Sequence, residues 1–472
     1  MYDEHYQILE FAWMKLGHST LDNMAWEYNT MSRPTLQPWI AIVVFKMMGM
    51  TDPFKMALVL RLITSFLGLS SLIPLCLLGM QWIKNEFLRK LFPVLLASLP
   101  IIAFVHARFS SEGFSCIFLI IGICFLLIGA THTSNQKKTT EYLYLILTGI
   151  AFAIAFVCRI QIALIFPGII VWATFIQKTS LKKMLIIGFV MLVIIGLCAV
   201  LDRYYYGVWV NSLWLYFKIN FLEGKADSFG TLPFFQYFTF VKSNAGFVWG
   251  WLLILTIIIG WTRKPLNIFT FAFLPYFLFH CIVGHKELRF LFPMVCGIPL
   301  FIVFAFDGLQ ILDFKIWKTG FKISGILFLI FFIASDLIWI FDVCLSPARI
   351  EFYAYKYLDR YRDQRIALIS YYEEEWPYGP NGHLNMDIYK PHDLVVKYHM
   401  PKEAELKQIA DSSKIPVYLY SISNNDLAPD QLTKSGLQYQ VEYKSLPDWL
   451  IRFKAWGVIK IQPIVTVYAI KK

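Results

Sequence analysis

Apolar stretches long enough to cross a membrane recur through the first three quarters of this sequence. A helix that crosses the hydrocarbon core of a bilayer needs about 20 mostly apolar residues. Hydrophobic residues make up 57% of the chain and charged residues only 16%, which excludes an ordinary soluble protein. The sequence therefore predicts a polytopic α-helical membrane protein with spans at 56–80, 92–107, 114–130, 142–157, 161–177, 184–201, 246–261, 266–283, 290–306 and 321–341.

Lysine and arginine collect in every second connection between these stretches. Because cytoplasmic loops are enriched in these residues, we expect those connections to face the cytoplasm. The net charge of +11 then reflects membrane topology, and nucleic-acid binding is not expected. The segment 1–55, the loop 202–245 and the segment 342–472 are predicted to share the opposite face.

A change of composition near residue 347 indicates a second domain. Tyrosine and charged residues become more frequent there, and the stretches IPVYLYSI and WGVIKIQPIVTVYAI alternate as strands do. We predict a transmembrane domain at 1–346, with a first outer loop at 1–55 and a large outer loop at 202–245. Residues 347–472 are predicted to form a small α/β domain outside the membrane, and residues 30–50 a re-entrant or interfacial helix.

The eight cysteines show no metal-ligand spacing, and seven of them lie in apolar segments. We interpret them as small buried hydrophobic residues. The sequence also lacks an Asp-x-Asp motif or another dense carboxylate cluster of the kind that binds a metal beside a nucleotide sugar. We therefore expect no metal and no other cofactor.

The chain opens with MYDEHYQILEFAWMKLG, which is dense in polar residues. Asp3, Gln7 and Glu10 are spaced four and three residues apart, so they would share one face of a helix, with Glu4 beside them. Two adjacent carboxylates near a membrane surface offer a general base. The alternative is a capped and solvated helix start.

A second charged motif, HKELRFLFP, begins at His285 and ends at Pro293. His285, Lys286 and Arg289 are expected to converge within one helical turn, where they would offer hydrogen-bond donors to a phosphate. The alternative is that they anchor the end of a helix at the membrane surface.

These motifs resemble the family 22 glycosyltransferases, which include dolichyl-phosphate-mannose-dependent mannosyltransferases. Four regions match in order across about residues 1–310. Three are ARFSSEGF, in which the family's Asn and later Glu are replaced, the loop that starts at LDRYYYG, and HKELRFLFP. The fourth is the family's first outer loop, matched by Asp3, Glu4, Gln7, Glu10, Trp26, Glu27, Tyr28, Arg33 and Pro34.

The resemblance implies a GT-C fold and an inverting transfer of a sugar, with mannose as the family default, from a polyprenyl phosphate. Asp3 would be the general base, with Glu4 as runner-up. The donor phosphate would be held by Arg289, His285 and Lys286. Second candidates for that role are Arg108, Arg159 and Arg203, each of which could equally be a helix-end anchor. The resemblance places Gln7, Glu27, Tyr28, Arg33 and Asp202 at the sugar or the acceptor.

The expected partners are the polyprenyl-phosphate sugar, a glycan or glycolipid acceptor, and membrane lipids. The active site would face the periplasm in a bacterium and the lumen of the endoplasmic reticulum in a eukaryote. Two other classes stay open: a secondary transporter or lipid flippase, and a non-catalytic membrane assembly subunit. The family's usual first transmembrane helix does not precede the Asp-Glu pair in this sequence, so we expect a misplaced start or a missing first helix.

Overall fold

The computed structural model describes residues 4–19, 21, 24–130, 138–245, 247–309, 351–361, 364–372, 389, 395–399, 401–423, 427–455 and 464–471. The chain divides by its packing into two units. The helical unit comprises Trp26–Gly49 and Ala57–Phe331, and the second unit comprises Met1–Ala25, Met50–Met56 and Phe332–Lys472. The predicted boundary at residue 346 lies outside the described residues and stays a prediction.

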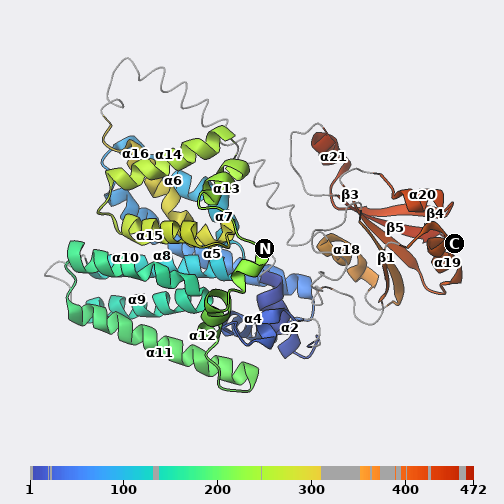
Figure 1. Cartoon of the computed structure of the whole chain (residues 1–472), viewed down its shortest axis with the longest axis horizontal. Coiled ribbons are helices and arrows are strands. Elements are labelled where there is room, and N and C mark those ends of the chain that lie inside the picture. The colour runs from blue at the N-terminus through green and yellow to red at the C-terminus, as the bar shows by residue number, and fades with distance from the viewer. Residues whose placement is uncertain are drawn as a thin grey trace, which may run out of the picture. The chain divides into compact units, whose positions relative to one another are not determined.

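Apolar helices follow the predicted spans closely (Figure 1). The long ones are α5 (Pro53–Gln81), α8 (Ser111–Ala130), α9 (Lys138–Cys158) and α11 (Leu181–Tyr206). The shorter ones are α6 (Glu86–Ser98), α7 (Pro100–His106), η3 (Ile160–Leu164), α10 (Phe166–Val171), η4 (Trp172–Ile176), α14 (Phe247–Arg263), α15 (Ile268–Ile282), η7 (Leu288–Gly297) and α16 (Ile298–Phe306).

Nine of the ten predicted spans fall on these helices, and the tenth, 321–341, lies outside the described residues. Within the described part of the chain, five helical segments are long and apolar enough to cross a membrane, or six if the bent pair α6 and α7 counts as one span. The remaining predicted spans fall on apolar helices of 10–17 residues. The prediction of a polytopic helical membrane protein is confirmed.

The bend between α6 and α7 measures 50° and has a cause in the sequence. Leu99 precedes Pro100, and its backbone is extended, with φ −64° and ψ 115°. A proline ring disfavours helical geometry in the residue before it, so one helix ends there and the next begins at the proline.

Close helix packing organises the helical unit. Helix α9 packs between α8 and α11, while α14 packs along α16. Helix α11 is largely exposed along its length, as expected for a lipid-facing span. Glycines permit the closest approaches: a Cβ atom on Gly168 would lie 1.9 Å from the carbonyl oxygen of Phe271, and one on Gly260 would lie 2.3 Å from that of Phe301.

Short helices form the loops of this unit: α3 (Trp26–Asn29), α4 (Leu36–Met47), α12 (Ser212–Phe217), η5 (Lys218–Leu222), η6 (Ala226–Phe229) and α13 (Gln236–Ala245). With 12 residues, α4 is too short to span a bilayer. The indole of Trp39 donates to the carbonyl of Leu201 at 3.2 Å and so ties α4 to the end of α11.

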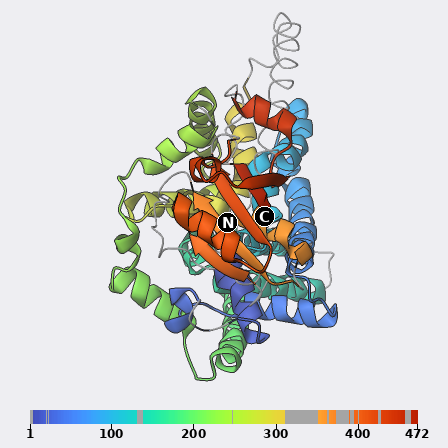
Figure 2. The ribbon, with the colours of Figure 1, turned by 90° about the vertical axis from the view of Figure 1, so that its right-hand side faces the viewer.

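The second unit contains a five-stranded mixed sheet of order β2-β1-β3-β5-β4, drawn in orange and red in Figures 1 and 2. Strands β1 and β2, and β1 and β3, pair in parallel, whereas β5 is antiparallel to β3 and to β4. Its strands are β1 (Ile366–Tyr372), β2 (Val395–His399), β3 (Val417–Ser423), β4 (Gln438–Lys444) and β5 (Ile464–Lys471). Its helices are η1 (His5–Leu9), α2 (Glu10–Lys15), α18 (Glu351–Leu358), η9 (Asp359–Tyr361), α19 (Glu403–Ser412), α20 (Asp430–Lys434) and α21 (Asp448–Ala455).

The central strand β3 reads VYLYSIS and is buried at every position, which explains its continuous apolar and aromatic character. Leu406 and Ile409 of α19 pack onto the sheet against Leu419 and Ile369. The prediction of a small C-terminal α/β fold is confirmed.

Candidate active site

A buried ion cluster joins three elements of the helical unit. The Glu112 carboxylate, at the start of α8, lies 3.1 Å from the guanidinium of Arg159, which follows α9. The same carboxylate lies 3.9 Å from Nε of Arg289, in the first turn of η7. The side chains are 0%, 4% and 25% exposed, respectively. Removing charges from water is costly, so such a cluster persists only where opposite charges balance.

The first outer loop reaches this cluster through Arg33. Its guanidinium donates to the Ser111 hydroxyl at 3.2 Å, and that hydroxyl donates to the second oxygen of Glu112 at 3.2 Å. The Tyr206 hydroxyl donates to the Arg33 carbonyl at 2.7 Å and holds the loop against the end of α11. Arg33 was predicted to contact the sugar or the acceptor, and the structure places it beside the cluster.

The HKELRF segment does not form the expected helical turn. Glu287 has an extended backbone, with φ −132° and ψ 142°, and helix η7 begins only at Leu288. The segment bonds instead to the large outer loop: the amide of Leu232 donates to the Gly284 carbonyl at 2.9 Å, and the Lys286 ammonium donates to the Leu232 carbonyl at 3.0 Å. The expectation of one shared turn was wrong, because loop pairing replaces the local helix.

The four charged side chains of this segment therefore divide into two groups. Lys286 is buried and donates to backbone carbonyls, those of Leu232 and Val283. Glu287 lies between His285 and Arg289, accepting from His285 Nε2 at 3.1 Å and from an Arg289 terminal nitrogen at 2.8 Å. The Arg289 Nε also pairs with Glu287. Arg289 is thus oriented by Glu287 and lies near Glu112. Lys286 is instead directed at backbone carbonyls and contributes no charge to this pair.

His285 is arranged to carry a proton. Its Nδ1 lies 3.0 Å from the Gly230 carbonyl and its Nε2 lies 3.1 Å from the Glu287 carboxylate. Both partners are acceptors, so the doubly protonated ring satisfies both. The hydrogen bond to Glu287 raises the pKa of His285 above its usual 6.5, against the opposing effect of partial burial.

Asp202 holds the same part of the first outer loop at Thr35, two residues after Arg33. One of its oxygens accepts from the Thr35 amide at 2.8 Å and from the Thr35 hydroxyl at 2.7 Å. Its other oxygen accepts from the Ser212 hydroxyl. A buried carboxylate with three donors ties the loop to α11 and α12. Asp202 was predicted at the acceptor; the structure shows its bonds to Thr35 and Ser212, and the acceptor role stays a prediction.

The remaining arginine candidates are placed differently. Arg108 is buried, with its guanidinium carbon 4.6 Å from the centre of the Phe104 ring. Arg203 donates to the carbonyl of Gly207, whose φ of +81° ends α11 in the left-handed conformation. A cation at the end of a helix is favourable by itself, which agrees with the helix-end alternative for Arg203.

Residues of α3 pack against the end of α11 and the loop 202–245. Glu27 is buried, and the ring of Tyr28 lies 6.3 Å from Tyr205 and 5.9 Å from Tyr206 between centroids. The Lys225 ammonium lies 5.8 Å from the centre of the Trp26 ring. These contacts hold α3 against the end of α11 and the large outer loop.

The polar N-terminal motif belongs to the second unit, so its geometry is described by itself. Glu4, Gln7 on η1 and Glu10 on α2 are all buried. The alternative interpretation of this motif as a solvated helix start is therefore wrong. Asp3, the predicted general base, lies outside the described residues. Its role stays a prediction.

Sequence reasoning missed the centre of the ion cluster. Glu112 lies in the ARFSSEGF match, and no role was assigned to it from the sequence. It stands two residues into a 20-residue apolar helix, α8, and an ionisable residue at the head of such a helix is itself a signal of a partner.

The fold and the ion cluster define a multi-pass membrane protein with a charged site close to the ends of several helices. The solved structure of ArnT from Cupriavidus metallidurans, bound to undecaprenyl phosphate, is similar, with a TM-score of 0.50. The similarity covers 99% of this chain and 93% of ArnT at 10% identity, so it shows the fold alone, a GT-C fold.

Residues 1–370 match the model of the Alg9-like mannosyltransferase family, and the chain belongs to that family. It is 28% identical over 308 residues to the probable Dol-P-Man:Man(7)GlcNAc(2)-PP-Dol alpha-1,6-mannosyltransferase of Schizosaccharomyces pombe, covering 64% of this chain and 53% of the relative. It is 26% identical over 325 residues to the mannosyltransferase APTG1 of Arabidopsis thaliana, covering 66% and 55%. The chain spans about half the length of these curated relatives.

Proposed function

We propose that this chain transfers mannose from a polyprenyl-phosphate carrier to a glycolipid or glycan acceptor, with inversion at the anomeric carbon. Membership of the Alg9-like mannosyltransferase family supports this reaction class. The name of the S. pombe relative specifies dolichyl-phosphate mannose as the donor and a lipid-linked glycan as the acceptor. We extend that substrate class to this chain. The active site is proposed to face the periplasm or the lumen.

The ion cluster carries the proposal. As the bond to mannose breaks, negative charge grows on the phosphate of the departing carrier, and preorganised cations lower the free energy of that transition state. Arg289 combines a partly exposed side chain with an orientation fixed by Glu287 and Glu112. It is therefore our choice for the phosphate contact, and Arg159 supplies a second, deeper positive charge.

The acceptor hydroxyl needs a base, and by family resemblance we assign that role to Asp3, with Glu4 as the runner-up. A base must come within hydrogen-bond reach of the hydroxyl when the substrates are bound. Glu4 is almost fully buried, which weighs against it. We further propose that transfer needs no metal, because the carrier phosphate is met by arginines.

A transfer assay tests the proposal directly. Purified full-length protein receives radiolabelled polyprenyl-phosphate mannose and membrane glycolipids in the presence of EDTA, and the product is counted after extraction. We expect transfer by the wild type and a loss of about 100-fold or more in Arg289→Ala. Arg89→Ala is the matched control, because Arg89 is an exposed arginine on α6, far from this cluster in sequence.

The base is tested in the same assay with Asp3→Asn and Glu4→Gln. Loss of transfer in the Asp3 variant with transfer retained in the Glu4 variant assigns the base to Asp3. Equal activity of Arg289→Ala and Arg89→Ala contradicts the phosphate contact. Absence of transfer from every polyprenyl-phosphate sugar directs attention to the transporter and assembly-subunit alternatives.

A further inference from the structure

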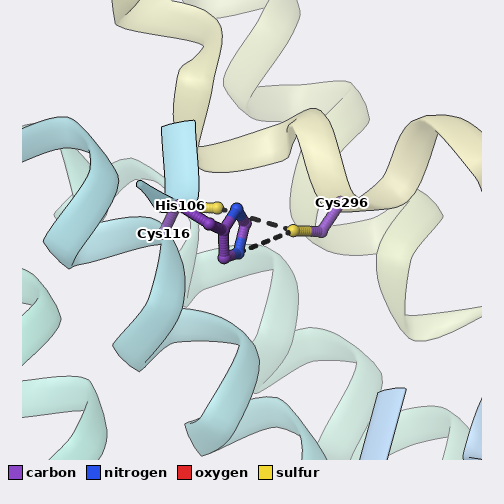
Figure 3. A group of neighbouring side chains, drawn as sticks. All are labelled: His106, Cys116 and Cys296. Carbon is purple, nitrogen blue, oxygen red and sulfur yellow. Dashed lines mark hydrogen bonds between the residues drawn. The ribbon is translucent and has the colours of Figure 1, made fainter. Parts of the chain in front are cut away.

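Three buried side chains with metal-binding atoms converge in the helical unit (Figure 3). His106 is the last residue of α7, Cys116 lies in the second turn of α8, and Cys296 lies near the end of η7. Their ligand atoms all lie within 4.8 Å of one another. None of these residues takes part in the ion cluster described above.

We propose that His106, Cys116 and Cys296 bind one zinc ion. Residue spacing could not reveal this site, because Cys116 and Cys296 are 180 positions apart. The proposed ion is structural and is separate from the sugar transfer, which we expect to proceed without a catalytic metal.

Two of the three distances between the ligand atoms match the edges of a zinc tetrahedron. With Zn–S of about 2.3 Å and Zn–N of about 2.05 Å, tetrahedral geometry gives an S–S edge of about 3.8 Å and an S–N edge of about 3.5 Å. The two sulfur atoms are 3.7 Å apart, and Cys296 Sγ lies 3.5 Å from His106 Nε2. The Pro293 carbonyl oxygen lies 3.6 Å from Cys116 Sγ and is an oxygen acceptor beside the cluster.

The histidine ring is already oriented as a ligand. His106 Nδ1 lies 3.0 Å from the carbonyl of Ile102, which can only accept, so Nδ1 carries the proton. The lone pair on Nε2 is then directed toward Cys296. Histidines that bind metals usually donate their other ring N–H to a carbonyl or carboxylate in this way.

Charge balance favours zinc over a monovalent ion. Binding releases one proton from each thiol, and two thiolates, a neutral imidazole and Zn²⁺ sum to zero net charge. All three side chains are buried among apolar helices, where an uncompensated charge is costly. Copper(I) on the same ligands would leave one net negative charge. The apolar surroundings therefore select a divalent ion with an affinity for sulfur.

The position of the site suggests its purpose. Cys116 follows Glu112 by one turn of α8, and Cys296 lies on η7, the element that carries Arg289. The proposed zinc thus joins the same two elements that meet in the ion cluster. A Cβ atom on Gly68 of α5 would lie 2.7 Å from Cβ of His106, so α5 supports the third ligand closely.

Metal analysis of the intact protein tests the site. The full-length chain is purified with an affinity tag that contains no histidine, and bound metals are measured by mass spectrometry after gel filtration in chelator-treated buffer. We expect about one zinc per chain in the wild type. Cys116→Ser and Cys296→Ser should lose it, whereas Cys124→Ser, which alters another buried cysteine of α8, should keep it.

Cobalt substitution gives a second readout. Co²⁺ bound by two thiolates should show thiolate-to-metal charge-transfer absorption in the wild type and in Cys124→Ser. Wild-type protein that folds with no bound metal overturns the proposal, as does a Cys116–Cys296 disulfide found by mass spectrometry without reductant. Zinc retained in both ligand variants overturns it as well. Because the readout is metal content, the result is independent of whether the transfer reaction is found.

Discussion

Glu112 and Arg159 form an ion pair of 3.1 Å in which both side chains are almost completely buried. The two residues come from α8 and from the turn after α9, helices that pack along each other. The pair therefore fixes the ends of two neighbouring helices at the point where Arg289 approaches from η7.

Replacing Glu112 by Gln should destabilise the helical unit, because it leaves the positive charge of Arg159 in a buried site without this carboxylate. Breaking a buried pair by removing one partner costs about 3–5 kcal/mol. Thermal unfolding in detergent measures the effect. Glu141→Gln is the control, since Glu141 pairs with Lys183 in a partly exposed position. Equal melting temperatures for the two variants would contradict the prediction.

Gly168→Ala should destabilise the packing of α10 against α15. A Cβ atom there would lie 1.9 Å from a backbone carbonyl oxygen, which no side-chain movement can relieve. Overpacking of this kind costs about 1–3 kcal/mol or more. Gly188→Ala on α11 is the matched control, because its Cβ would have no neighbour within 4 Å. It should be neutral, or stabilising by up to about 1 kcal/mol. Melting temperatures distinguish the two.

The contact between His285 and Glu287 should make stability depend on pH. The pKa of His285 is raised in the folded protein, chiefly by Glu287, so the contact stabilises the fold fully below the unfolded value of 6.5. That contribution is lost as the pH rises through the folded pKa. Comparing the wild type with Glu287→Gln between about pH 5.5 and 8.5 tests this. The difference in melting temperature should shrink toward high pH, and a constant difference would refute it.

Asp202→Ala should loosen the first outer loop, because the Thr35 amide, the Thr35 hydroxyl and the Ser212 hydroxyl lose their shared acceptor. Leaving buried donors unsatisfied costs about 1–3 kcal/mol each. Asp202→Asn keeps one carbonyl oxygen for Thr35 and should be milder. Limited proteolysis reports on the loop, and the order of cleavage rates should be alanine, asparagine, wild type. Identical rates would argue against this role.

Arg289→Lys should retain only part of the transfer activity expected under the proposed function. Lysine keeps the charge but lacks the planar group that meets Glu287 through two nitrogens. We expect a loss of about tenfold, between the wild type and the alanine variant. Initial rates at saturating donor provide the measurement. A lysine variant as impaired as the alanine variant would show that geometry matters more than charge.

Sequence predicted the helices well, because a span is encoded by a continuous local run. Nine of the expected spans lie on helices for this reason, and the strand IPVYLYSI was found from its own composition. The bend at Pro100 is local too, although the span at 92–107 was predicted without it.

Features that depend on distant segments were not predicted. The turn at His285 failed because this segment bonds to a loop more than 50 positions away. The Gly284 carbonyl accepts from the Leu232 amide, and the side chains of His285 and Lys286 bond to the carbonyls of Gly230 and Leu232. Glu112 gained its partners only when three helices met. The cysteines were interpreted as small buried hydrophobic residues, because ligand spacing within a sequence detects only neighbouring ligands. His106, Cys116 and Cys296 come together only through folding.

The length of α11 makes the protein sensitive to bilayer thickness. Its 26 residues measure about 39 Å, but the apolar run 184–201 between its charged ends measures about 27 Å, close to a hydrocarbon core of about 30 Å. Asp202 lies about 32 Å along the helix from Leu181, close to where hydrocarbon gives way to head groups. A thicker bilayer would draw the Asp202 end toward the acyl chains. Hydrophobic mismatch would then act first on the attachment of the outer loop.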